Sequence, residues 1–360
     1  MVSKKNPTLV GFSAGDPNGI GIEAIVRTFQ DERMFQEATP VLYATKNLVE
    51  AALEITGLER TLPWAMVENA EAAKKDQLNV VSIQPDPWTL DWGNVTAEAG
   101  GFAMASLDHV VQDLAATKVE VLVTAPIHKE AMRKSAFQFP GHTEYLANIA
   151  NVDEVLMLLV AGDLRVGICT GHIALKDVSS ALKSDLIVKK ANLMHDALLK
   201  DFGIPNPRIA ILGLNPHASD NGLMGDEENQ IIGPAVRELS DSGKIVMGPY
   251  AADGFFGSGA HRKFDGVLAM YHDQGLAPFK AMSFGQGVNY TAGLPVVRTS
   301  PDHGTGFDIA GKGTASGDSM RAAIFLARDI RSNRQDFRTY GADPLPIQPK
   351  NRRDDDRDRR

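Results

Sequence analysis

Cysteine is almost missing from this chain of 360 residues, which contains only Cys169. A single cysteine excludes a disulfide framework within the chain and favours a reducing compartment, so we expect a cytoplasmic protein. Its apolar runs are all shorter than the roughly 18–20 residues that cross a bilayer. The segment Met1–Thr8 has no apolar stretch typical of a secretion signal. We therefore expect no association with a membrane.

Excess positive charge is missing as well, because the net charge is −8 and the pI is about 5.6. This balance disfavours nucleic acid as the main partner, but a small phosphorylated ligand needs only a few local cations. Two common phosphate-binding signatures, GxGxxG and the Walker A loop, do not occur in the sequence. Any nucleotide site must therefore be built in another way.

Strand-like apolar runs alternate with amphipathic helical segments along most of the chain. This alternation predicts an α/β fold in which parallel strands are joined by crossover helices. At about 100–200 residues per domain, the length suggests two domains. The expected strands are 8–12, 40–44, 78–83, 119–123, 155–160, 166–170, 208–212 and 267–270, and the expected helices are 22–29, 48–55, 97–115, 144–149, 186–202, 227–240 and 318–331.

The most informative stretch begins with the buried strand Val267–Met270 and the polar residues that follow it, Tyr271 to Gly275. Ligands of open α/β sheets bind just beyond the carboxyl ends of strands, which is where His272 stands. Further along are a lysine, an amide and an arginine, each close to a glycine or proline. Together these groups suit a small anionic ligand. They are Lys280, Asn289 and Arg298.

Three histidines share one position relative to the expected strands, since His172, His217 and His272 each follow a strand end. Three neutral imidazoles suit Zn²⁺, Co²⁺ or Ni²⁺ and leave coordination positions open for a substrate. Ligands dispersed over about 100 residues have no diagnostic spacing, so the residues alone leave this interpretation open. A hydrolytic metal site remains an alternative.

Two further polar positions are candidates for ligand binding. His142 and Thr143 stand at the expected start of a helix, where an imidazole and a hydroxyl can hold a phosphate or carboxylate. Asp253 precedes Gly254, and it is either a turn residue or an acid with a role in the site.

Three motifs make the chain recognisable: Tyr271–Leu276, Gly287–Asn289 and Arg298–Gly304. Together they resemble the 4-hydroxythreonine-4-phosphate dehydrogenase family of vitamin B6 biosynthesis, within the isocitrate and isopropylmalate dehydrogenase superfamily. Matching motifs extend from Gly11 to Gly313. The chain departs from the family at Ile22, where proline is usual, and at Ser219-Asp220, where Gly-Glu is usual.

The resemblance implies two α/β domains with a cleft between them. The first domain would comprise residues 1–130 and 295–332, and the second residues 131–294 with the metal-binding loops and the dimer interface. The resemblance also implies a homodimer whose active site is shared, with one histidine coming from the partner subunit. The mixed charges of residues 333–360 predict a disordered tail.

The resemblance further implies NAD-dependent, metal-dependent oxidation and decarboxylation of 4-phosphooxy-L-threonine to 3-amino-2-oxopropyl phosphate and CO₂. NADP is the alternative cofactor, and Zn²⁺ is the expected metal, with Co²⁺ or Mg²⁺ as alternatives. The alternative substrates are the 4-phosphates of D-threonate and D-erythronate, oxidised on the same scaffold. The implied residues are His172, His217 and His272 for the metal; His142, Thr143, Lys280, Asn289 and Arg298 for the substrate; Lys280 and Asp253 for catalysis; and Asp302, His303, Gly304, Asp308, Gly311 and Lys312 for the cofactor.

Overall fold

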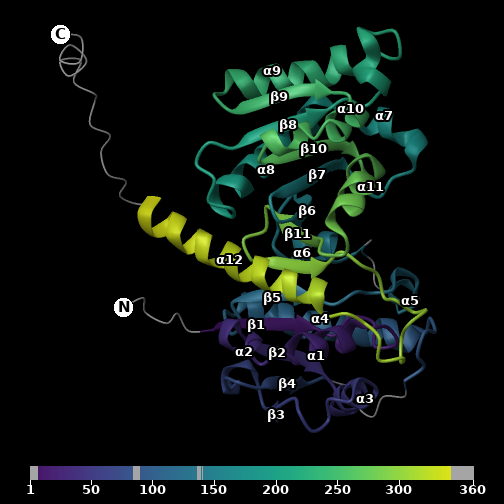
Figure 1. Cartoon of the computed structure of the whole chain (residues 1–360), viewed down its shortest axis with the longest axis vertical. Helices are drawn as coiled ribbons and strands as arrows, with labels where there is room; N and C mark the ends of the chain where they lie inside the picture. Colours follow the sequence, from purple (N-terminus) through teal and green to yellow (C-terminus); the bar gives the residue numbers. More distant parts are fainter. Residues whose placement is uncertain (1–6, 84–89, 136–138, 140, 342–360) are drawn as a thin grey trace, which may run out of the picture.

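A mixed sheet of twelve strands forms the centre of the computed structural model, which describes residues 7–83, 90–135, 139 and 141–341 (Figure 1). The predicted α/β class is confirmed. In spatial order the strands of the described chain are β3 (Trp64–Val67), β4 (Leu78–Ser82), β2 (Ala38–Ala44), β1 (Thr8–Ser13), β5 (Val121–Thr124), β12 (Arg298–Pro301), β11 (Val288–Ala292), β6 (Leu156–Ala161), β7 (Leu164–Thr170), β10 (Gly266–Tyr271), β8 (Arg208–Leu212) and β9 (Ile245–Tyr250).

The helices follow from local sequence signals, and α4 (Ala97–Ala115) has the predicted bounds. Thr96 caps it by accepting a hydrogen bond from the backbone N–H of Ala99 at 3.1 Å. None of the helices in the described part of the chain has the length and apolar character that crossing a membrane requires. The other α-helices are α1 (Gly21–Phe29), α2 (Met34–Glu37), α3 (Lys46–Thr56), α5 (Lys129–Lys134), α6 (His142–Ile149), α7 (Val178–Ala181), α8 (Ser184–Lys200), α9 (Gly233–Asp241), α10 (Ala252–Gly257), α11 (His272–Ser283) and α12 (Asp318–Gly341).

The sheet is not parallel throughout, which corrects the expectation drawn from the alternating pattern. In the spatial order, the first six strands, from β3 to β12, form one parallel block, and the last four, from β7 to β9, form another. Between these blocks lie β11 and β6, which are antiparallel to their neighbours. β6 and β7 form an antiparallel hairpin, with Leu159 paired to Val166. The domain boundary expected at residue 295 lies between β11 and β12, which are hydrogen-bonded to each other. The sheet is therefore continuous across both predicted domains.

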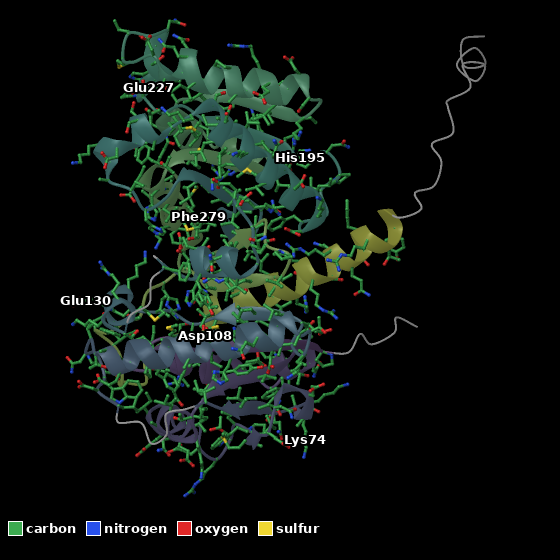
Figure 2. The ribbon with its side chains drawn as sticks, turned by 180° about the vertical axis from the view of Figure 1, so that it is seen from behind. Lys74, Asp108, Glu130, His195, Glu227 and Phe279 are labelled. Atoms are coloured by element: carbon green, nitrogen blue, oxygen red, sulfur yellow. The ribbon has the colours of Figure 1, made fainter. Side chains whose placement is uncertain are left out.

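The two halves of the molecule are joined by helices as well as by the sheet. Tyr145 of α6 donates a hydrogen bond to the carboxylate of Asp108 on α4, which is labelled in Figure 2. Helix α12 crosses the middle of the molecule and buries Met320, Ala323 and Ile324 completely (Figure 1). Movement of one half against the other would therefore disturb contacts on several elements.

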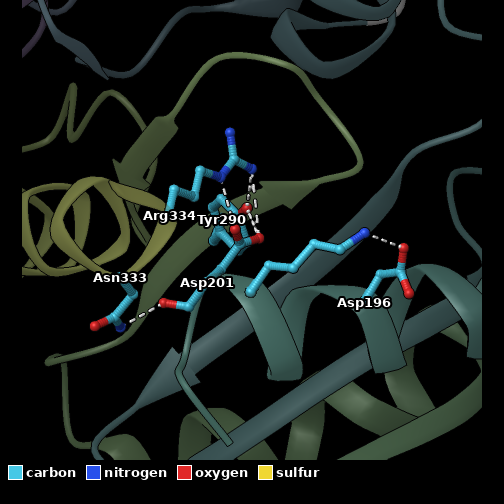
Figure 3. A network of polar contacts seen from close by, with 6 residues as sticks. Asp196, Asp201, Tyr290, Asn333 and Arg334 are labelled. Carbon is cyan, nitrogen blue, oxygen red and sulfur yellow. Dashed lines mark hydrogen bonds and ion pairs between the residues drawn. The ribbon is translucent and has the colours of Figure 1, made fainter. Parts of the chain in front are cut away.

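Helix α12 extends past the expected end at residue 331, so the prediction of disorder is wrong for residues 333–341. A buried polar network holds this part of the helix (Figure 3). Arg334 Nε donates to Asp201 Oδ1 at 2.6 Å, and Arg334 Nη2 donates to the hydroxyl of Tyr290 at 2.9 Å. Asn333 Nδ2 donates to the carbonyl of Asp201 at 2.7 Å. The rest of the predicted tail, residues 342–360, lies outside the described residues.

Replacing Arg334 with methionine is expected to lower the free energy of unfolding by about 3 kcal/mol, because Asp201 would be left as a buried carboxylate without its cation. Asp201 is only 4% exposed. Urea denaturation of the two proteins measures the difference. Arg338→Met removes an exposed arginine one turn further along α12 and serves as the control. Equal losses in both variants would show that the ion pair with Asp201 contributes nothing.

Candidate active site

A cavity of about 400 Å³ lies where residues of β5, β12, β11 and β6 meet the start of α6 and one side of α11. It brings together residues that are up to 180 positions apart in the sequence, from Thr124 to Gly304, as expected of a site built from loops on an α/β scaffold. The implied site residues that line this cavity are His142, Thr143, His172, His272, Lys280, Asn289, Arg298, Asp302, His303 and Gly304, whereas His217, Asp253, Asp308, Gly311 and Lys312 are not part of its lining.

Arg298 is the most buried cation of the cavity, with 3% of its surface exposed. Its guanidinium donates to Thr124 Oγ1 at 2.6 and 3.1 Å and to Thr291 Oγ1 at 3.3 Å. Among the described residues no carboxylate forms an ion pair with it, and burial lowers its pKa to about 10. Glu144 opposes this lowering through its charge but forms no ion pair with Arg298. A desolvated guanidinium without a paired carboxylate is well suited to a carboxylate or phosphate ligand.

His142 is held in one tautomer by its contact with Arg298. Arg298 Nη2 lies 3.3 Å from His142 Nδ1, and a guanidinium can only donate, so Nδ1 accepts and the proton is on Nε2. Burial, and then the charge of Arg298, lower the pKa of His142, which keeps the ring neutral. Within the described residues its Nε2 has no hydrogen-bond partner. His142 therefore adds an uncommitted donor beside the guanidinium.

Lys280 and Asp302 form an ion pair in the cavity, with Nζ and Oδ1 separated by 3.4 Å. Burial raises the pKa of Asp302, and the charge of Lys280 opposes that rise. The structure thus places Asp302 beside a predicted catalytic residue, although the resemblance assigned it to the cofactor. Together with Glu144, Asp302 brings negative charge to a cavity whose other charged groups are mainly cationic.

His172 and His272 converge at the carboxyl ends of the neighbouring parallel strands β7 and β10, with ring centroids 5.7 Å apart. His272 Nδ1 contacts Asp273 Oδ1 at 2.6 Å, an arrangement that orients many metal-binding histidines and leaves Nε2 for the metal. Imidazole donors in this arrangement suit a divalent cation. No group of three His, Cys, Asp or Glu side chains in the described chain is arranged to hold a metal ion. The three-histidine site therefore stays a prediction.

His217 follows β8, the next strand in the sheet, as predicted, but its side chain is exposed and does not line the cavity. Residues 217–221 all have left-handed backbone conformations, with φ between 47° and 68°. This conformation costs non-glycine residues roughly 1–2 kcal/mol each, so the rest of the structure must hold the segment in place.

Asp253, expected to take part in the site, lies exposed in the first turn of α10. The structure does not bring it to the cavity.

Several lining residues were not assigned to the site from the sequence. The sequence did contain a usable signal for Thr124 and Lys129, because polar residues at or just after the carboxyl end of a buried strand are candidates for ligand binding. The unassigned polar and charged residues are Thr124, Lys129, Glu144 and Ser300.

The loop from Asp302 to Gly313 leads from the cavity to the first βα loop. The backbone N–H of Ile20 donates to the carbonyl of Thr305 at 2.9 Å, and the ring of Phe307 stacks on His128 at 4.9 Å. Lys312 Nζ donates to the carbonyl of Asp308 at 2.6 Å and remains exposed. An exposed cation held on this loop has the chemistry needed to bind a dinucleotide phosphate.

Asp16, at the start of that first βα loop, is 1% exposed, and its Oδ2 has no partner among the described residues. Burial raises its pKa from 3.8 to about 6, although the N–H of Asn18 and the nearby His128 oppose the rise. A raised folded-state pKa favours folding at low pH. This contribution is present below pH 3.8 and is lost as the pH rises through about 6.

The free energy of unfolding of the wild type is therefore expected to fall by roughly 3 kcal/mol between about pH 4 and pH 6. Asp16→Asn is expected to abolish this fall. Asparagine keeps the acceptor for the N–H of Asn18 and carries no charge. Thermal unfolding of both proteins across pH 4–8 provides the measurement. The variant should be the more stable protein at pH 7, and parallel curves for the two proteins would contradict the prediction.

Comparisons with known proteins agree with this geometry. The family described as "Pyridoxal phosphate biosynthetic protein PdxA" matches residues 36–327. The chain belongs to the PdxA family. A relative from Bacteroides thetaiotaomicron, named 4-hydroxythreonine-4-phosphate dehydrogenase, is 45% identical over 353 residues, which cover 98% of this chain and 96% of the relative. A relative from Cutibacterium acnes, provisionally named D-threonate 4-phosphate dehydrogenase, is 37% identical, and the match covers 89% of this chain and 93% of the relative.

Solved structures named 4-hydroxythreonine-4-phosphate dehydrogenase have the same fold. The crystal structure of 4-hydroxythreonine-4-phosphate dehydrogenase from Klebsiella pneumoniae aligns with a TM-score of 0.79 at 34% identity. The alignment covers 91% of this chain and 99% of that one. The family and the dehydrogenase class inferred from the sequence are thus confirmed, while the individual site residues rest on the geometry above.

Proposed function

We propose that this PdxA-family chain oxidises 4-phosphooxy-L-threonine with NAD and decarboxylates the product to 3-amino-2-oxopropyl phosphate in vitamin B6 synthesis in the cytoplasm. The observation that carries the proposal is Arg298, a buried guanidinium in a cavity that also holds Lys280 and two converging histidines. A substrate with a phosphate at one end and a carboxylate at the other needs two separate cations, and Arg298 and Lys280 supply them.

The chain's own residues bind and orient the substrate. Arg298 and the Nε2–H of His142 donate to one anionic group, and the Oδ1 atom of Asn289, which has no partner among the described residues, is left to accept from a substrate donor. Lys280 is positioned by Asp302 to contact the reacting end and to transfer protons there. These contacts fix the substrate carbon that loses the hydride.

His172 and His272 would hold the divalent cation, Zn²⁺ or Co²⁺, with His217 as the third ligand. When bound, this cation supplies Lewis-acid stabilisation of negative charge that develops on substrate oxygens. The loop from Asp302 to Gly313 would hold NAD, which accepts the hydride. Of the three proposed ligands, the described part of the chain brings His172 and His272 together. A homodimer that shares its sites would explain this if His217 came from the partner subunit.

A second candidate substrate is D-threonate 4-phosphate, because a relative at 37% identity carries that provisional name. The two substrates differ at C2, where only phosphooxy-threonine has an amine. Asp253, expected to take part in the site, is not in the cavity, whereas the carboxylates of Glu144 and Asp302 line it and can pair with an ammonium group. The presence of these two acids in the cavity favours the amino substrate.

The test is NADH formation by the purified protein with a divalent metal and each phosphorylated substrate offered separately. Turnover of 4-phosphooxy-threonine alone is the expected result. Turnover of threonate 4-phosphate alone would support the proposed site but show that threonate 4-phosphate, and not 4-phosphooxy-threonine, is the substrate. Turnover of neither, in wild-type protein that also binds no metal, would overturn the proposal.

A further inference from the structure

A buried carboxylate beneath the His217 loop has no part in the substrate cavity. Glu228 is 3% exposed and begins η4 (Glu228–Ile232), a π-helical turn. Its Oε1 accepts hydrogen bonds from the backbone N–H groups of Leu214 and Asn215, both at 2.7 Å. Its Oε2 accepts from Asn215 Nδ2 at 2.9 Å. Glu228 therefore fixes the backbone immediately before His217.

Asn215 connects this carboxylate to the segment that follows His172. Its Nδ2 also donates to Glu227 Oε2 at 2.7 Å, and Glu227 Oε1 accepts from Ser179 Oγ of α7 at 2.6 Å. Adjacent helical side chains normally point about 100° apart, but here both carboxylates converge on one amide. A side chain at Gly225 would prevent this, because its Cβ would lie 2.6 Å from Glu227 Oε2. Glu227 is labelled in Figure 2, in the half of the molecule that contains α9.

Gln274 connects Gly213, at the start of the His217 loop, to β10, the strand that precedes His272. Its Nε2 donates to the carbonyl of Gly213 at 2.5 Å, and its Oε1 accepts from the backbone N–H of Met270 at 2.7 Å. Gln274 stands two residues after His272 on α11. The anchoring network, comprising Ser179, Asn215, Glu227, Glu228 and Gln274, thus joins the segments that carry all three predicted metal ligands.

We propose that Glu228, acting through Asn215, is a positioning residue that sets the relative placement of the three histidine-bearing segments for metal binding. The inference rests on the proposed metal site. The anchoring network stabilises the left-handed segment 217–221, because Glu228 accepts hydrogen bonds from the N–H groups of Leu214 and Asn215, directly before this segment. This role is the same whether His217 completes the site of its own chain or that of a partner subunit.

The test variant is Glu228→Gln, which keeps the shape and removes one acceptor. Its single oxygen can still accept from the two backbone N–H groups, but its amide then faces Asn215 Nδ2, so that two donors meet. Asn215 must turn away, which also breaks its bond to Glu227. Glu238→Gln removes the same charge from an exposed position on α9 and is the matched control.

Two measurements separate positioning from general stability. Co²⁺ titration, followed by visible absorption, is expected to show affinity about 10–100-fold lower in Glu228→Gln than in the wild type, which is typical for residues that support metal ligands. Hydrogen exchange of the metal-free proteins is expected to be faster at Leu214 and Asn215 in the same variant, because a neutral amide oxygen accepts from their N–H groups more weakly than the carboxylate does. Glu238→Gln should match the wild type in both measurements.

Equal Co²⁺ affinity in Glu228→Gln and the wild type would overturn the positioning role, whatever the activity of the variant. A wild-type chain that binds no Co²⁺ would instead remove the metal site itself, and this role with it. If Glu228→Gln does not fold, Gln274→Met breaks only the link between Gly213 and β10 and is expected to weaken Co²⁺ binding in the same direction. Unchanged affinity in that variant would then overturn the proposal.

Discussion

Arg298→Met is expected to lower kcat/KM for the phosphorylated substrate by about 100–1000-fold, while KM for NAD changes by less than about twofold. A bidentate guanidinium makes two charge-assisted hydrogen bonds to an anion, each contributing roughly 1.5–3 kcal/mol. Both are lost in methionine, which fills a similar volume. Initial-rate kinetics with each substrate varied in turn provide the measurement.

Arg298→Lys is the informative control, because it keeps the charge and loses the planar fork. We expect it to fall between the wild type and Arg298→Met. The folded protein should tolerate both changes, since no carboxylate among the described residues forms an ion pair with Arg298 and none is left unpaired. Equal increases in KM for substrate and for NAD would show that Arg298 is structural.

His217→Ala is expected to reduce kcat by about 1000-fold or more and to weaken metal binding, because one of three imidazole ligands would be lost. This variant is the sharpest test of the metal site, since His217 is exposed and lies outside the cavity in the single chain. The measurement is turnover together with Co²⁺ affinity, before and after treatment with EDTA.

His109→Ala is the matched control for that experiment, because it removes an exposed imidazole from α4. It should keep the turnover and the metal affinity of the wild type. Full activity in His217→Ala would remove the three-histidine hypothesis and leave His172 and His272 as a two-ligand site.

The sequence predicted the strands that precede the histidines well, because β7, β8 and β10 are short apolar runs ended by glycine or polar residues. The prediction of secondary structure failed where glycine and proline residues lie inside a helix. Gly275 and Pro278 argue against a helix, yet α11 runs from His272 to Ser283 and includes both. Gly275 faces Val166 and Ala269 so closely that a side chain would not fit, so tertiary packing overrides helix propensity there.

The site was predictable where a residue's position follows from a strand end or a matched motif. His142, Lys280, Asn289 and Arg298 line one cavity, as their types suggested. Contacts between distant segments had no sequence signal, and the ion pair of Lys280 with Asp302 depends on such a contact. The anchoring network was invisible for the same reason, because two adjacent glutamates on a helix give no indication that both reach one asparagine.

The place of β12 in the sheet has a consequence for synthesis of the chain on the ribosome. β12 (Arg298–Pro301) hydrogen-bonds to β5 (Val121–Thr124), so the amino-terminal block of strands has an open edge until residue 301 has been made. Exposed sheet edges pair readily with other chains. We therefore expect the nascent amino-terminal half to need protection, by a chaperone or by the ribosome surface, until nearly the whole protein has emerged.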